Sequence, residues 1–296
     1  MMNWKNALIV CAMTSLVPGP ISAVEIIAHR GASFDAPENT VAAMRLGYEQ
    51  AADASELDIY MTKDQRVVVL HDRDTARVSG VTNKPGETVL EDLRRLPAGQ
   101  WGKWKGSQFT ETIPSLEEML AVVPRGKRIF IEVKCGLEVL PELARVLHAS
   151  GLNDRQLVII GFDYQTMLQT KAQLPRLQVF WLAGADKNKK YPPVEDLIAK
   201  ARAAGFDGLN LEQGFPIDSA FVKRVRKAGL KLYTWTVDDP VVARQLAEAG
   251  VNGITTNRPK WLRKQLECPG ALKAPSLNAG LALTQIPSER ADVDAL

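Results

Sequence analysis

The strongest constraint on the fold is a regular alternation of short apolar strands with amphipathic helices, which begins near Pro114. The first helix of this series is residues 115–122, where Ser115 and Glu118 form a capping-box pattern. The pattern then predicts strands at residues 128–134, 157–160, 178–182, 208–211, 230–235 and 253–255, and helices at residues 137–149, 164–174, 194–204, 218–228, 240–249 and 259–266. Alternating strands and helices are typical of a parallel sheet.

Two more strands are predicted before this series. One is Glu25–His29, and residues 41–51 follow it with apolar side chains at helical spacing and Asn39 as the expected N-cap. The other is Glu56–Met61. Eight strands in about 250 residues predict a (β/α)8 TIM barrel. An open doubly wound sheet is the alternative, but no glycine-rich phosphate-binding loop follows any predicted strand.

The second strand is followed by a second apolar run after only four residues. Such a short connection predicts an antiparallel hairpin, since a parallel crossover needs about a dozen residues. Pairing Met61 with Arg66 places His71 opposite Glu56, on the face that also carries Asp58. The hairpin therefore predicts a cluster of two carboxylates and one imidazole; the alternative is an ordinary solvated face.

Residues 73–112 interrupt the alternation of strands and helices, which indicates a small insertion after the second barrel strand. Turn residues occupy positions 82–86, and residues 90–96 fit a short helix. We expect Trp101 and Trp104 to serve local packing.

Composition excludes some classes of protein. The chain has 296 residues, enough for one large domain or two small ones, and its net charge of +3 gives no indication of nucleic-acid binding. Its three cysteines form no disulfide framework and no C-x-x-C motif. Oligomeric state is not indicated.

Residues 1–23 have the features of a secretory signal peptide: Lys5, an uncharged run from Ala7 to Val17, and a small residue at Ala23. The run is shorter than the roughly 18–20 residues that span a bilayer. An uncleaved anchor helix or an extension is the alternative. We therefore expect a periplasmic or secreted protein without stable membrane insertion after cleavage, with a barrel at residues 24–267. Residues 268–296 are predicted to be mostly disordered, with a short docked helix near Leu281 as the alternative.

Polar residues gather at the carboxyl ends of the predicted strands, where barrel active sites lie. Three acids there, Glu56, Asp58 and Glu132, need a counter-charge if they face the interior. Carboxylate ligands without cysteine favour Ca²⁺ or Mg²⁺. The cations Arg30 and Lys134 fit an anionic group such as phosphate.

Two of the three histidines, His29 and His71, fall at the same end of the barrel. Imidazoles titrate near neutral pH, so the pair suits general base and general acid on opposite sides of phosphorus. The third, His148, lies within a predicted helix and is expected at the surface or in packing.

The ordered set of motifs resembles the glycerophosphodiester phosphodiesterase family from about Glu25 to Trp261. The matching motifs are His29-Arg30-Gly31, Pro37-Glu38-Asn39-Thr40, Glu56-x-Asp58 with Thr62-Lys63-Asp64, His71-Asp72, Ile113-Pro114-Ser115-Leu116-Glu117-Glu118, Glu132-Val133-Lys134, Thr234-Trp235-Thr236-Val237 and Gly250-Val251-Asn252-Gly253. The resemblance implies a (β/α)8 barrel with an insertion after the His-Asp pair. It also implies hydrolysis of glycerophosphodiesters, such as glycerophosphocholine or glycerophosphoethanolamine, to sn-glycerol 3-phosphate and an alcohol.

Roles carried over by motif are implied by the resemblance. The metal ligands would be Glu56, Asp58 and Glu132; the acid–base pair His29 and His71; the phosphate-binding residues Arg30 and Lys134; and the site-lining residues Asn39 and Trp235. Attack by a glycerol hydroxyl through a cyclic phosphate and direct attack by water both stay open.

Two departures from the family pattern are visible. Asn257 stands where the family often has Asp, and Cys135 follows the Glu-x-Lys strand. We expect both to lie outside the chemistry, with Cys135 able to alter only the rim.

Two other functions stay open. One is phospholipase D-type action on lysophospholipids or sphingomyelin; the other is a non-catalytic module that binds phosphodiesters. The insertion favours a small soluble substrate, and no basic amphipathic helix indicates membrane docking.

Overall fold

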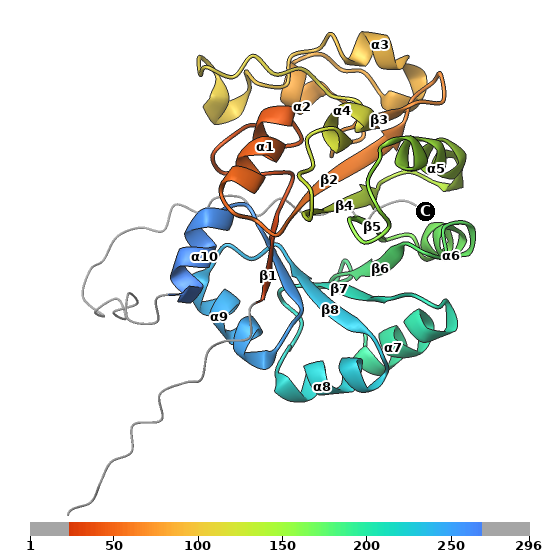
Figure 1. Cartoon of the computed structure of the whole chain (residues 1–296), viewed down its shortest axis with the longest axis vertical. Helices are drawn as coiled ribbons and strands as arrows, with labels where there is room; N and C mark the ends of the chain where they lie inside the picture. Colours follow the sequence, from red (N-terminus) through yellow and green to blue (C-terminus); the bar gives the residue numbers. More distant parts are fainter. Residues whose placement is uncertain (1–23, 268–296) are drawn as a thin grey trace, which may run out of the picture.

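The computed structural model describes residues 24–267, which form a closed barrel of eight parallel strands (Figure 1). The strands are β1 (Glu25–Ala28), β2 (Ala54–Met61), β4 (Arg128–Val133), β5 (Leu157–Gly161), β6 (Gln178–Ala183), β7 (Gly208–Glu212), β8 (Lys231–Trp235) and β9 (Gly253–Thr256). Each strand pairs with its neighbours in this order, and β9 pairs with β1 to close the ring. The predicted barrel is confirmed. The expected signal peptide and tail lie outside the described residues.

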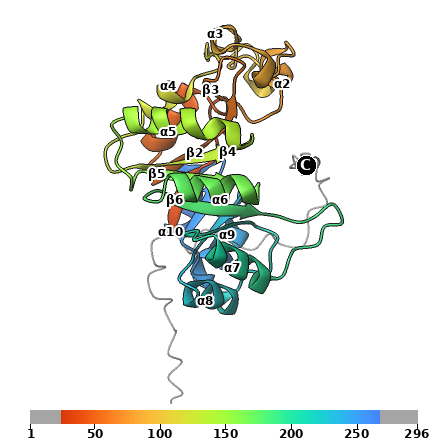
Figure 2. The same cartoon turned by 90° about the vertical axis from the view of Figure 1, so that its right-hand side faces the viewer.

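Helices cover the outside of the barrel, as Figures 1 and 2 show from two directions. They are α1 (Val41–Glu49), α4 (Leu116–Leu120), α5 (Leu140–Ala149, preceded by the 3₁₀ turn Leu137–Val139), α6 (Tyr164–Gln173), α7 (Val194–Ala203), α8 (Ser219–Lys227), α9 (Pro240–Ala249) and α10 (Pro259–Glu267). The capping box of Ser115 and Glu118 is present at α4. Outward-facing residues of the strands pack against these helices in the largest apolar cluster.

The prediction that Asn39 caps α1 is wrong. The N-cap is Thr40, whose Oγ1 accepts a hydrogen bond from the backbone N–H of Ala43 at 3.2 Å. Asn39 instead has a left-handed backbone with φ 54°, and its side chain points toward the barrel. A left-handed asparagine is well tolerated because its short polar side chain finds local partners.

The antiparallel hairpin is confirmed, but its predicted register is wrong by one residue. Strand β3 (Val67–Val69) pairs Val67 with Met61. Thr62 and Arg66 close the loop, with 2.9 Å between the Thr62 nitrogen and the Arg66 oxygen, so the loop holds three residues rather than four. Gln65 in this loop has φ 57°, the left-handed position common in three-residue hairpin loops. Counted from this register His71 would face Leu57, yet β3 ends at Val69 and His71 reaches the site from the segment beyond it.

The insertion after β3 forms a small layer beside the barrel, at the top of Figure 1. Its short elements are α2 (Ala76–Ser79), α3 (Leu90–Leu93) and the 3₁₀ turns Pro85–Glu87 and Gly102–Trp104. Its own apolar cluster includes Val68, Leu93 and Ile113, against which Trp101 packs. Trp104 meets Phe109 edge-on with ring centroids 5.4 Å apart. Both tryptophans serve local packing, as expected.

The interior of the barrel is layered. At the amino-terminal end, Arg128 binds both carboxylate oxygens of Glu25, at 2.8 and 2.6 Å. Above this pair, the rings of Phe130, Phe180 and Tyr233 fill the middle, with Phe180 and Tyr233 stacked at 4.8 Å. This aromatic layer separates the ionic lower end from the polar upper end.

Gly31 is required where β1 passes into the loop before α1. Its backbone has φ +79°, and a Cβ there would collide with the backbone carbonyl of Ala43. Gly80 has a similar φ of +75° but faces open space. We expect Gly80→Ala to lower the free energy of unfolding by about 1 kcal/mol through backbone strain alone. Gly31→Ala should lower it by about 3 kcal/mol, because strain and overpacking combine.

Urea denaturation of the two variants and the wild-type protein measures this difference. Equal losses in the two variants would show that the close approach to Ala43 contributes nothing.

Candidate active site

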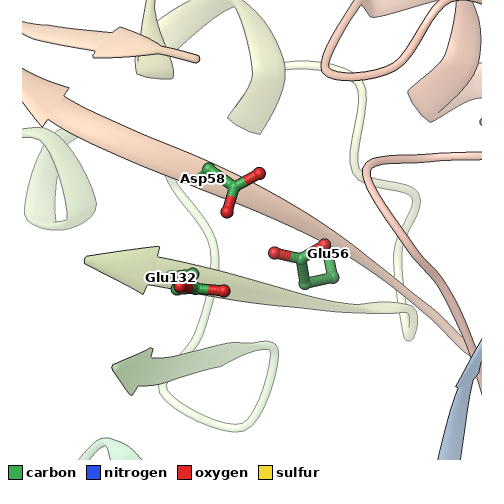
Figure 3. Close-up of side chains that lie close together, drawn as sticks. All are labelled: Glu56, Asp58 and Glu132. Carbon is green, nitrogen blue, oxygen red and sulfur yellow. The ribbon is translucent and has the colours of Figure 1, made fainter. Parts of the chain in front are cut away.

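Three carboxylates converge from the middle of β2 and from near the carboxyl end of β4 (Figure 3). Asp58 and Glu132 are direct partners in the parallel register of these strands, and Glu56 precedes Asp58 by two residues on the same face. One oxygen of each acid lies within 4.8 Å of one oxygen of the others. Glu56 and Asp58 are buried, and the Glu132 side chain is 12% exposed. The structure therefore brings together all three predicted metal ligands.

Burial and mutual repulsion disturb the titration of these acids. Burial, together with the charges of Asp58 and Glu132, raises the pKa of Glu56 well above its usual value. Burial and the charge of Asp58 also raise the pKa of Glu132. Burial opposes ionisation of Asp58 as well, but the charges of His71 and Lys134 lower its pKa. Such a cluster is electrostatically suited to a cation, which would offset the repulsion.

One atom of the cluster has no partner of its own. Oε1 of Glu56 is buried and accepts no hydrogen bond from any residue in the described range, whereas Oε2 accepts the backbone N–H of Arg30 at 2.9 Å. A buried carboxylate oxygen without a donor is costly unless a cation or ligand reaches it. The donor set, three carboxylates without sulfur, fits a hard divalent cation.

Two positive side chains lie beside the acids. The Nε atom of Arg30 is 3.4 Å from Oδ2 of Asp58, and Nη1 donates to Glu38 at 3.0 Å. The ammonium of Lys134 donates to Glu132 at 2.9 Å and lies 3.7 Å from Asp58. Burial opposes this charge, but the two carboxylates raise the pKa of Lys134. Arg30 and Lys134 therefore provide positive charge beside the acids, where an anionic group of a substrate could bind.

Asn39 holds Asp58 in place. Its Nδ2 donates to Oδ2 of Asp58 at 2.8 Å, and its Oδ1 accepts the Asp58 backbone N–H at 3.3 Å. The left-handed turn at Asn39 aims the amide inward. Asn39 therefore orients one of the clustered acids within the site.

His29 follows β1 and faces the acids. Its Nε2 lies 4.0 Å from Oε2 of Glu56, and its Nδ1 lies 2.8 Å from Oδ1 of Asn257. Burial and the neighbouring charge of Arg30 lower the pKa of His29 to about 4. The expectation that Asn257 stays clear of the proposed catalytic residues is wrong: it contacts His29, because the closed barrel places the segment after β9 beside the segment after β1.

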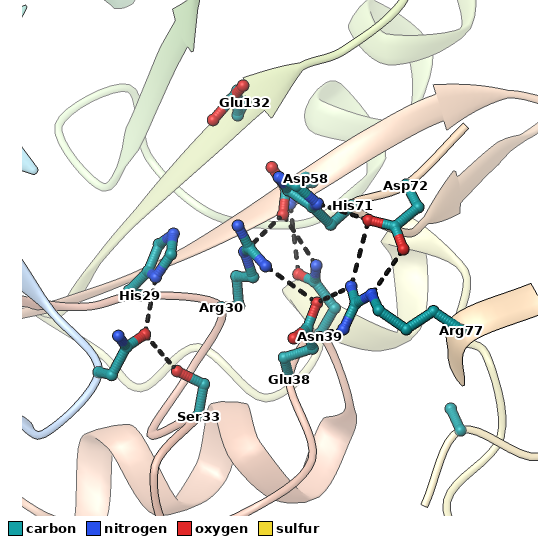
Figure 4. A network of polar contacts seen from close by, with 12 residues as sticks. His29, Arg30, Ser33, Glu38, Asn39, Asp58, His71, Asp72, Arg77 and Glu132 are labelled. Atoms are coloured by element: carbon teal, nitrogen blue, oxygen red, sulfur yellow. Dashed lines mark hydrogen bonds and ion pairs between the residues drawn. The ribbon is translucent and has the colours of Figure 1, made fainter. Parts of the chain in front are cut away.

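His71 is held by a chain of polar contacts and ion pairs (Figure 4). Its Nδ1 lies 2.8 Å from Oδ1 of Asp72, and Nε of Arg77 donates to the other oxygen of Asp72 at 2.6 Å. Nη2 of Arg77 also donates to Glu38 at 2.7 Å, and Glu38 in turn accepts from Arg30. Arg77 thus joins the insertion to the loop that carries Arg30.

Three further residues considered in the sequence are Trp235, His148 and Cys135. Trp235 ends β8 at the same end of the barrel; its indole donates to the Asn210 carbonyl at 3.1 Å, and its ring meets Phe162 edge-on. His148 is exposed on α5, as expected. Cys135 packs against the large apolar cluster, and burial raises its pKa to about 12.

Sequence reasoning missed four residues that orient this site. Glu38 and Asp72 lay inside recognised motifs but received no role, and Asn257 was set aside as a neutral departure. Arg77 carried no signal at all, because it lies in the insertion, and only the fold brings it to Glu38 and Asp72.

Acids, imidazoles and cations gathered at one end of a (β/α)8 barrel are the arrangement expected of an enzyme that acts on an anionic substrate. A sequence model of the Glycerophosphoryl diester phosphodiesterase family matches residues 29–261. The chain belongs to this family, as its motifs indicated.

Individual proteins of this family are similar to the chain in sequence and in structure. A glycerophosphodiester phosphodiesterase of Caldanaerobacter subterraneus subsp. tengcongensis is 30% identical over 246 residues, which cover 80% of this chain and 95% of that protein. One of Bacillus subtilis is 28% identical, with 80% and 85% covered. The solved structure of an Oleispira antarctica phosphodiesterase in complex with the product sn-glycerol-3-phosphate is similar at a TM-score of 0.74 and 27% identity, covering 82% of this chain and 97% of that one.

No helix among residues 24–267 combines the length and the apolar content needed to cross a bilayer.

Arg77 should stabilise the junction between the insertion and the barrel. We expect Arg77→Met to lower the free energy of unfolding by about 1–3 kcal/mol, because it leaves Asp72 and Glu38 short of charged donors. Hydrogen exchange should also show faster exchange in residues 70–80, and denaturation measures the loss.

Arg95→Met is the matched control in the same insertion. Arg95 is 70% exposed, and its pairs with Glu91 and Asp92 are worth at most about 0.5 kcal/mol. If both variants exchange and unfold like the wild-type protein, Arg77 does not hold the insertion.

Proposed function

We propose that this protein hydrolyses glycerophosphodiesters to sn-glycerol 3-phosphate and an alcohol with the help of one divalent cation, Ca²⁺ or Mg²⁺. The convergence of Glu56, Asp58 and Glu132 beside two imidazoles carries the proposal. Family membership and the product named in the Oleispira antarctica complex support this substrate class. The partner is thus a small soluble molecule, not a nucleic acid.

The three acids would hold the cation. When bound, it supplies positive charge that polarises a phosphoryl oxygen and stabilises the charge that develops during displacement. The unpartnered Oε1 of Glu56 and the raised pKa values of Glu56 and Glu132 support this role. Asn39 keeps Asp58 aimed at the cluster through two hydrogen bonds.

The cations of the site would bind the phosphodiester. Arg30 and Lys134 flank Asp58 and present charged N–H donors at the barrel mouth. A phosphate group placed there meets both side chains and orients its scissile bond. Trp235 would line the other side of the mouth, where it contacts Phe162.

The two histidines would move the protons. One imidazole removes a proton from the attacking oxygen, and the other donates a proton to the leaving alcohol oxygen, so proton gain and loss balance. In the view of Figure 4, His29 and His71 lie on either side of Arg30, which supports roles for them on opposite sides of a phosphate bound by Arg30. The attacking oxygen belongs either to a glycerol hydroxyl, through a cyclic phosphate, or to water.

Assays with glycerophosphocholine and glycerophosphoethanolamine test the proposal. We expect release of sn-glycerol 3-phosphate from both, faster than any release of choline from lysophosphatidylcholine. Excess chelator should abolish turnover, and Ca²⁺ or Mg²⁺ should restore it. Glu56→Gln should lower kcat by about 100-fold or more, because a neutral amide is a poor ligand for a hard cation.

Glu91→Gln is the control, since Glu91 lies exposed in the insertion and should leave kcat unchanged. Full turnover in excess chelator would contradict the metal proposal. Preference for lysophosphatidylcholine would favour a phospholipase D-type enzyme, and binding without turnover would favour a non-catalytic module.

We infer that the protein is exported to the periplasm or secreted, since residues 1–23 have the features of a signal peptide. Expression of the full chain should yield a mature protein that begins near Val24, with activity in the exported fraction. Mass spectrometry of its N-terminus measures the cleavage. An intact N-terminus on active protein in the cytoplasmic fraction would contradict export.

A further inference from the structure

The segment after β9 contacts His29 through a side chain that has no role in the proposed function above. Oδ1 of Asn257 lies 2.8 Å from Nδ1 of His29 and accepts the Ser33 hydroxyl at 2.7 Å. The His29 backbone N–H also donates to the Thr256 carbonyl at 2.9 Å. His29 is therefore fixed at two points by the last barrel strand and the residue that follows it.

Asp238, in the loop after β8, determines which way the Asn257 amide faces. Its carboxylate accepts the backbone N–H of Asn257 at 2.8 Å, Nδ2 of Asn257 at 2.6 Å, and the Thr256 hydroxyl at 2.7 Å. A carboxylate accepts hydrogen bonds and offers none. The NH₂ group of Asn257 must consequently face Asp238, and its oxygen must face His29.

The orientation of this amide determines the tautomer of His29. An amide oxygen is only an acceptor, so Nδ1 of His29 must carry the hydrogen. In the neutral imidazole the lone pair then lies on Nε2, the atom that faces Glu56 at 4.0 Å. The geometry leaves His29 able to accept a proton on the side of the acidic cluster.

We propose that Asn257 is a positioning residue that holds His29 in the Nδ1–H tautomer, with Asp238 orienting Asn257, so that Nε2 of His29 is the general base. This inference rests on the proposed function, because it assigns His29 one of the two proton-transfer roles. It also explains the departure from the family pattern. A carboxylate at position 257 would point an oxygen at the carboxylate of Asp238, and two like charges at that separation repel strongly.

Exchanging the side chains at positions 238 and 257 tests the proposal. Asn257→Asp alone should lower kcat for glycerophosphocholine by about 10- to 100-fold, because repulsion from Asp238 displaces the acceptor. Its KM should stay within about threefold, since the Asn257 side chain acts on His29, Ser33 and Asp238 and is not proposed to bind phosphate. Combining it with Asp238→Asn should restore kcat to within about threefold of wild type, since the donor and the acceptor have merely changed places.

Asp239→Asn is the matched control. Asp239 lies next to Asp238 but caps α9, with its Oδ1 accepting the Val241 N–H at 2.7 Å, and asparagine caps a helix equally well. It removes the same charge from the same loop without touching Asn257, so kcat should not change.

A spectroscopic measurement tests the tautomer without reference to turnover. In protein labelled with ¹⁵N-histidine, the chain's three histidines give few signals, and His29→Gln identifies those of His29. We expect a protonated Nδ1 and an unprotonated Nε2 in the wild type, loss of this pattern in Asn257→Asp, and its return in the exchanged pair.

An unprotonated Nδ1 in the wild type, or a doubly substituted protein no better than Asn257→Asp, would overturn the proposal. If the expected tautomer is present but no glycerophosphodiester is hydrolysed, the positioning of His29 by Asn257 is supported and the proposed function fails.

Discussion

The parallel register between β2 and β4 is the constraint on which the site depends. It sets Asp58 directly opposite Glu132, and the two-residue repeat of a strand adds Glu56 to the same inward face. A slip of β2 by one residue would turn its acids outward and bring Leu57 inward, and a slip of β4 would do the same with Glu132 and Ile131; both apolar residues now pack outward against the helices. The outward apolar residues therefore hold the acids in place, because burying them fixes the register.

The layering of the barrel interior explains how so much charge is tolerated at one end. The rings of Phe130, Phe180 and Tyr233 fill the middle, so the acids above them are not in contact with the Arg128–Glu25 pair below. The charged groups at the two ends are thus kept apart by this aromatic layer. At the upper end, Arg30 and Lys134 offset part of the negative charge, and the burial that raises the pKa of Glu56 also favours a bound cation.

Periodicity predicted the barrel because each strand and helix carries its own pattern in a few residues. It predicted the three acids for the same reason, since a strand that faces a barrel interior shows its polar residues at every second position. Periodicity failed to predict the hairpin loop length and the helix cap, because each depends on the backbone angle of one residue. The left-handed Gln65 made the hairpin loop three residues long, and the left-handed Asn39 moved the helix cap to Thr40. Neither conformation is visible in the residue type alone.

Contacts between segments far apart in the chain were the other source of error. Asn257 and His29 are 228 positions apart, so no local motif contains both. Closure of the barrel nevertheless makes its first and last strands neighbours, and the residues just beyond them must then meet at the same end. Once eight strands are predicted, a polar residue after the last strand should be tested as a partner of the residue after the first. Applied to this sequence, that argument leads directly from His29 to Asn257.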